Sequence, residues 1–177
     1  MILEKLRKLE IESMQRGIPI VGSVKGKFLY EKVLEIKPKK ILELGTANGY
    51  SGTILGSQGA KLITIDPNEK ILEEARKNFK QFNIDAKIIV GDAVNEVKKL
   101  AKDKKNLGSF DIIFIDFIKS EYINVLENCI KLVRKNGLII ADNITFLGCQ
   151  DYKKKVLEDK RLKTEIINIS DGISSSR

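Results

Sequence analysis

Apolar residues follow two alternating patterns along the chain. In some stretches they recur every three or four residues, which predicts helices with one buried face. These stretches are 2–15, about 24–36, from about 50 onward, 67–82, 93–102 and 122–133. In others they form short continuous runs, which predict strands buried on both faces. These runs are 41–45, 61–65, 87–90, 110–115 and 138–141.

The order of these stretches predicts an α/β fold. Strands that alternate with helices form a doubly wound parallel sheet, and such sheets bind ligands beyond the carboxyl ends of their strands. Residues 163–176 resemble two shorter strands broken at Asp171 and Gly172, which is a hairpin signal. No repeat or linker divides the chain, so we expect one domain over 1–177, with a helical cover at 1–36 and a sheet core at 37–177.

Composition narrows the class of protein. The 177 residues are 42% hydrophobic, and no apolar run approaches the roughly 20 residues that span a bilayer. The amino-terminal residues are charged and amphipathic, unlike a secretory signal, so we expect a cytoplasmic protein, and two isolated cysteines agree with this. The chain contains no histidine, which excludes Ser-His catalysis and the usual zinc sites. Any metal must therefore be held by oxygen.

The net charge of +8 raises nucleic acid as a partner. The lysines are scattered, however, and few aromatic residues lie among them to stack on bases. A solvated basic surface is therefore the favoured interpretation, with a nucleic-acid groove as the alternative. The oligomeric state stays open, a homodimer included.

The stretch from Lys40 to Gly52 gives the first indication of a ligand. An apolar strand is followed at once by Gly45, Gly49, Gly52 and the start of a helix. Glycines let backbone N–H groups approach a ligand, and a helix start adds free donors, which favours a nucleotide-like molecule over glycines that serve only a tight turn. Ala47 stands where the dinucleotide fingerprint G-x-G-x-x-G has its second glycine, so a pyrophosphate is disfavoured.

Aspartates follow the second and third predicted strands. Asp66 would accept hydrogen bonds from both hydroxyls of a ribose, or else cap a helix whose first turn contains Pro67. Asp92 and Ala93 would lie near an adenine edge, or else Asp92 would cap the next helix.

Oxygen-bearing side chains also follow the fourth and fifth strands, which we expect to be neighbours in the sheet. Asp116 ends one strand, and Asp142 and Asn143 end the other. Such a set suits a hard cation such as Mg²⁺ that retains water and substrate oxygens. Lys119 would act as a general base if the site lowered its affinity for a proton, and otherwise it is a solvent-facing lysine at a helix start.

Five motifs together resemble those of the cation-dependent O-methyltransferases, the group that contains catechol O-methyltransferase and the caffeoyl-CoA O-methyltransferases. The motifs are 21–27, 43–51, 110–122, 141–143 and 170–173. They follow the family's order over about residues 18–176. The resemblance implies a doubly wound, seven-stranded and mostly parallel sheet with an antiparallel last strand, the cofactor S-adenosylmethionine, and Mg²⁺ or another divalent cation.

The resemblance also implies roles for individual residues. Lys119 is the implied base, and Glu165 is placed where catechol methyltransferases carry a carboxylate that grips the second substrate hydroxyl. The implied cation ligands are Asp116, Asp142 and Asn143. The implied cofactor-binding residues are Val21, Gly22, Gly45, Tyr50, Ser51 and Asp66, to which we add Asp92, Ala93 and Asp116.

The sequence departs from the family at several points. Asp66 replaces the usual glutamate, and Phe117 and Ile118 replace larger polar and aromatic groups of the substrate wall. The connection after Asn143 and the amino-terminal cover are both short. The acceptor pocket is therefore the part of the family's site that the resemblance predicts least well for this chain. The favoured function is Mg²⁺-dependent methyl transfer to an oxygen of a small hydroxylated acceptor. The alternatives are an RNA- or protein-directed methyltransferase and a cofactor-binding module without turnover.

Overall fold

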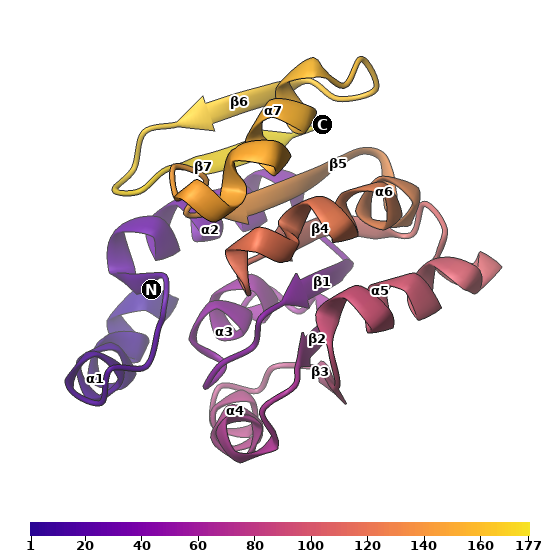
Figure 1. Ribbon diagram of the computed structural model, residues 1–177. Coiled ribbons are helices and arrows are strands. Elements are labelled where there is room, and N and C mark those ends of the chain that lie inside the picture. The colour runs from indigo at the N-terminus through magenta and orange to yellow at the C-terminus, as the bar shows by residue number, and fades with distance from the viewer.

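A seven-stranded sheet forms the centre of the computed structural model, which describes all residues 1–177 (Figure 1). The strands are β1 (Lys40–Leu44), β2 (Lys61–Asp66), β3 (Ala86–Val90), β4 (Phe110–Ile115), β5 (Val133–Asp142), β6 (Thr164–Ile167) and β7 (Ile173–Ser176). Their order in the sheet is β3-β2-β1-β4-β5-β7-β6. The first five strands pair in parallel, whereas β7 runs antiparallel to both of its neighbours. The predicted doubly wound sheet with an antiparallel last strand is confirmed.

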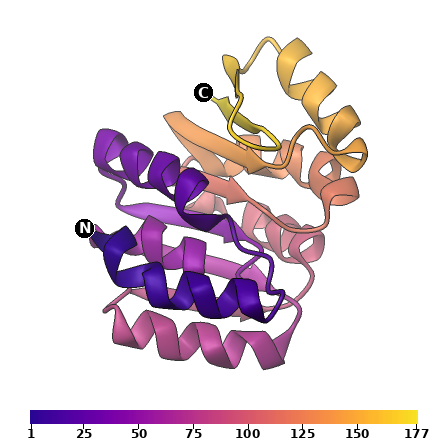
Figure 2. The same ribbon diagram turned by 90° about the vertical axis from the view of Figure 1, so that its left-hand side faces the viewer.

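Helices cover both faces of this sheet (Figures 1 and 2). They are α1 (Ile2–Gln15), α2 (Gly22–Ile36), α3 (Tyr50–Gly56), α4 (Glu69–Gln81), α5 (Ala93–Lys102), α6 (Tyr122–Leu132) and α7 (Gln150–Glu158). One face packs against α2, α3 and α4, with α1 lying outside α2 and α3. The other face packs against α5, α6 and α7. Successive strand residues point to opposite faces, so each face has its own apolar core.

Two of the boundaries that differ from the sequence prediction are informative. Pro67 does not lie in a helical turn, because α4 begins at Glu69 and the side chain of Asn68 caps it. The carboxylate of Asp66 is turned instead toward the loop after β1. Strand β5 begins at Val133, earlier than predicted. Val133 already pairs with Phe110 of β4, ahead of an irregularity in the register of the two strands.

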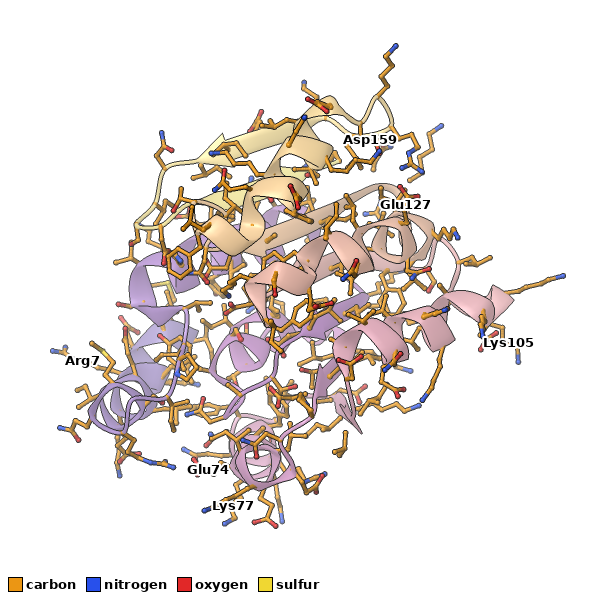
Figure 3. The ribbon with its side chains drawn as sticks, in the orientation of Figure 1. Arg7, Glu74, Lys77, Lys105, Glu127 and Asp159 are labelled. Carbon is orange, nitrogen blue, oxygen red and sulfur yellow. The ribbon has the colours of Figure 1, made fainter.

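Charged side chains are spread over the outside of the molecule. Figure 3 shows Arg7 projecting from α1 and Lys105 projecting beyond α5, on opposite sides of the fold. No helix combines the length and the apolar character needed to cross a bilayer. Helix α1 is the first element of the chain, and strand β7 is the last.

Candidate active site

Two adjoining hollows lie at the carboxyl ends of the parallel strands. The first has a volume of about 370 Å³ and is lined by the loops after β1, β2, β3 and β4. The second has a volume of about 380 Å³ and lies over the ends of β4 and β5. The hollows share Pro19, Ile20, Asp116 and Lys119. Two ligands bound in them would therefore meet at Asp116 and Lys119.

The loop after β1 forms one wall of the first hollow. Gly45 has a φ of +98°, and a Cβ atom there would lie 1.9 Å from the carbonyl oxygen of Asp116, so only glycine fits this position. Ala47 also adopts a left-handed conformation, with a φ of +44°. Its N–H and that of Thr46 donate to the Oδ2 atom of Asp66, at 3.1 and 3.2 Å. Asp66 thus fixes the loop and lines the hollow at once.

Beneath this loop, Glu43 is buried completely. Its two carboxyl oxygens accept hydrogen bonds from the hydroxyls of Ser51 and Thr64, each at 2.6 Å. Burial raises the pKa of Glu43 to about 8, because an ionised carboxylate is poorly solvated there. Ser51, expected at the cofactor, therefore lines the hollow with its hydroxyl already engaged by Glu43.

Most of the expected cofactor residues come together. The first hollow is lined by Gly45, Tyr50, Ser51, Asp66, Asp92, Ala93 and Asp116. Val21 lines the second hollow instead, and Gly22 lines neither. The side chain of Asp92 also caps α5, accepting from the N–H of Asn95 at 2.9 Å, as one of its two interpretations predicted. Sequence reasoning missed Pro19 and Ile20, which line both hollows.

The second hollow contains the three oxygen-bearing residues predicted to hold a cation. Asp116 accepts from the Nζ atom of Lys119 at 2.6 Å, and that Nζ lies 2.9 Å from the hydroxyl of Tyr122. Asp142 is buried, and burial together with the charge of Asp116 raises its pKa to about 6, although Lys25 opposes this. Lys25 donates to Asp142 and also to Asp171. In this site each lysine ammonium group therefore lies against one or two aspartate carboxylates.

The free oxygens of this set fit a hard cation. Asp116 Oδ1, Asp142 Oδ1 and Asn143 Nδ2 are each engaged by a protein group. One side-chain oxygen of each residue has no protein partner. These oxygens are Asp116 Oδ2, Asp142 Oδ2 and Asn143 Oδ1. No three acidic, histidine or cysteine side chains gather to hold a metal by themselves, so the donor set is two carboxylates and one amide. Such a set leaves positions for water and for an acceptor.

Glu165 does not join this group. It lines a separate hollow of about 250 Å³ together with Lys163, Glu35 and Arg177. The reason is register: Ile173 of β7 pairs with Asp142, whereas Glu165 lies opposite Ser175, two residues further along. Glu165 therefore lies outside both hollows at the carboxyl ends of the parallel strands.

Two further residues of the second hollow were not predicted. Lys25 and Asp171 belong to motifs noted in the sequence, but neither was given a role of its own. A lysine amid the apolar residues of α2 was the available signal, because a buried lysine requires an acidic partner.

The chain is similar over residues 1–177 to the family described as O-methyltransferase. It is 31% identical over 170 residues to catechol O-methyltransferase B of Danio rerio, which covers 88% of this chain and 64% of that protein. It is 31% identical over 151 residues to caffeoyl-CoA O-methyltransferase of Stellaria longipes, covering 82% and 62%. The chain thus spans slightly less than two thirds of the length of these relatives.

A solved structure shares the fold. The O-methyltransferase from Bacillus cereus in complex with SAH has a TM-score of 0.84 against this chain, at 24% identity, and the match covers 98% of this chain and 89% of that one.

Proposed function

The chain belongs to the O-methyltransferase family, and we propose that it transfers a methyl group from S-adenosylmethionine to an oxygen of a small hydroxylated acceptor, with the aid of a divalent cation such as Mg²⁺. One observation carries this proposal. Asp116, Asp142 and Asn143, each with one unpartnered oxygen, line the second hollow, which adjoins the first. A cofactor in one hollow and an acceptor in the other would bring methyl donor and oxygen together.

The first hollow suits the cofactor. Gly45 keeps the loop close to the end of β4, and Asp66, which lines the hollow after β2, is the carboxylate proposed to bind the two ribose hydroxyls. One oxygen of Asp66 already binds the loop, and the other accepts from the N–H of Asn68 at 2.9 Å. Carboxylate oxygens accept more than one hydrogen bond each, so ribose binding does not require these bonds to break.

Lys119 is the group proposed to take the proton that the acceptor loses. Its Nζ atom is held between Asp116 and Tyr122 at the boundary of the two hollows. When bound, the cation would hold the acceptor oxygens and lower the pKa of the reacting hydroxyl. The hydroxyl proton would pass to Lys119 Nζ, and S-adenosylmethionine, when bound, would supply the methyl group, its carbon–sulfur bond breaking as the carbon–oxygen bond forms. For this step Lys119 must first lose its own proton.

The test separates the cofactor from the cation. S-Adenosylhomocysteine should bind in titration calorimetry with or without EDTA, whereas methyl transfer to a catechol-like acceptor should require Mg²⁺ and stop with EDTA. Asp142→Ala should abolish turnover as EDTA does, because it removes a charged ligand. Lys119→Ala should keep cation binding and lower the rate by about 10²–10⁴-fold.

Lys104→Ala is the matched control, because Lys104 is an exposed lysine in a short helical turn away from both hollows. Turnover that is unaffected by EDTA would disprove the cation assignment. Tight cofactor binding without transfer to any hydroxylated acceptor would instead favour a binding module.

A further inference from the structure

A layer of side chains behind the candidate cation ligands determines which of their atoms are free. Asn143 donates through Nδ2 to the Oδ2 atom of Asp171. This contact fixes the amide, because a flipped amide would set its oxygen against the carboxylate of Asp171 and leave Nδ2 without an acceptor. The atom of Asn143 left for a ligand is therefore Oδ1, which is the atom a cation requires.

Asp142 is oriented in the same way. Its Oδ1 atom accepts from Lys25 Nζ and from the N–H of Asn143, the latter at 2.7 Å, so that Oδ2 is left free. Lys25 also donates to Oδ1 of Asp171. Its side chain is only 7% exposed, and these two carboxylates are its ionic partners. One lysine thus fixes the distance between Asp142 and Asp171.

Asp171 itself is anchored by backbone contacts. Its carbonyl oxygen accepts from the hydroxyl of Thr145 at 2.8 Å and from the N–H of Thr145 at 3.2 Å. Both of its carboxylate oxygens are engaged, one by Lys25 and the other by Asn143. Asp171 therefore has the geometry of a residue that holds ligands in place, and not of a ligand.

We propose that Asp171, acting with Lys25, is a positioning residue of the cation site, which presents Asn143 Oδ1 and Asp142 Oδ2 to the cation. This inference rests on the proposed function, because it concerns the cation assigned there. Loss of a group that orients the direct ligands of a metal commonly weakens metal affinity by about 10–100-fold. Here the lysine comes from α2 and the aspartate from the loop between β6 and β7, so two distant parts of the chain would determine the affinity.

Asp171→Asn is the sharpest test. Asparagine has the same shape, but an NH2 group replaces one of the two oxygens, so it cannot accept from Lys25 on one side and from Asn143 on the other. We expect the dissociation constant for Mn²⁺, measured from the electron paramagnetic resonance signal of the free ion, to rise about 10–100-fold. Affinity for S-adenosylhomocysteine, measured with EDTA present, should be unchanged, because Asp171 does not line the first hollow.

Asp85→Asn is the matched control. It also removes one negative charge, but Asp85 is exposed and precedes β3, away from the hollows. This variant should bind Mn²⁺ as the unaltered protein does. Equal Mn²⁺ affinity in the unaltered protein and Asp171→Asn would overturn the inference and leave the proposed function intact. Loss of S-adenosylhomocysteine affinity in Asp171→Asn would show a general structural role and overturn it too. Absence of Mn²⁺ binding in the unaltered protein would overturn both the inference and the cation assignment.

Discussion

At the residue scale, Glu43 shows how a polar group is tolerated beneath the loop after β1. It lies on β1 between apolar neighbours and points to the same face as α3. Hydroxyl groups of Ser51 and Thr64 satisfy its oxygens, but burial still raises its pKa to about 8. The folded protein therefore holds a proton on Glu43 over a range in which the unfolded chain, with a pKa near 4.5, has released it.

The proton on Glu43 makes stability depend on pH. Its stabilising contribution is complete below about pH 4.5, declines as pH rises and is lost above about pH 8, because the unfolded chain binds fewer protons in that window. Glu43→Gln cannot ionise. In urea unfolding, the free energy of unfolding should fall between pH 5 and pH 8 in both proteins. We expect this fall to be smaller in the variant by roughly 4 kcal/mol. Parallel pH dependence in the two proteins would show that Glu43 ionises normally.

At the element scale, α1 is tied to the loop after β1 by a buried polar contact. Asn48 donates through Nδ2 to the hydroxyl of Ser13 at 2.7 Å, and Ser13 donates in turn to the carbonyl oxygen of Leu9. Asn78 of α4 donates to the carbonyl oxygen of Asn48. The Oδ1 atom of Asn48 is buried without a partner, so the bond to Ser13 is the one that secures this side chain. Helix α1 thus supports the loop from outside.

Removing this contact should destabilise the protein. Ser13→Ala leaves Asn48 Nδ2 buried without an acceptor, and we expect the free energy of unfolding to fall by about 1–3 kcal/mol. Ser57→Ala is the control, because Ser57 makes only a local bond to the carbonyl oxygen of Ile54 and should cost less. Chemical denaturation measures both variants. Equal effects would mean that α1 is held by its apolar face alone.

At the scale of the whole molecule, most arginines are engaged in ion pairs. Five of the six arginines pair with carboxylates, and Arg7 is the exception. Arg161, for example, joins Glu127 of α6 to Asp159 after α7, both labelled in Figure 3. An arginine engaged in this way must exchange its carboxylate partner for a phosphate before it can bind RNA.

Binding of RNA should therefore be weak and governed by salt. We expect a labelled single-stranded RNA to show no change in fluorescence anisotropy at about 200 mM salt, because scattered lysines provide only counterion release. The same titration at low salt is the control for non-specific binding. Binding that persists at the higher salt would support an RNA-directed acceptor.

The sequence by itself determined the order of elements and most of the lining of the first hollow. Continuous apolar runs and helical spacing depend only on local burial, so they predicted β1 to β5 and the helices between them. Because parallel strands end at one edge of a sheet, the residues that follow them were expected to meet. Gly45, Asp66 and Asp116 do line one hollow.

Only the tertiary structure decided the contacts between segments that are distant in the chain. Lys25 meets Asp142 and Asp171 across 117 and 146 residues, and no local pattern encodes such a pairing. Register decided the place of Glu165, because the offset between β6 and β7 depends on the loop that joins them. Sequence periodicity fixes which face a side chain occupies, whereas the partners of a buried charge follow from packing and from the need to satisfy it.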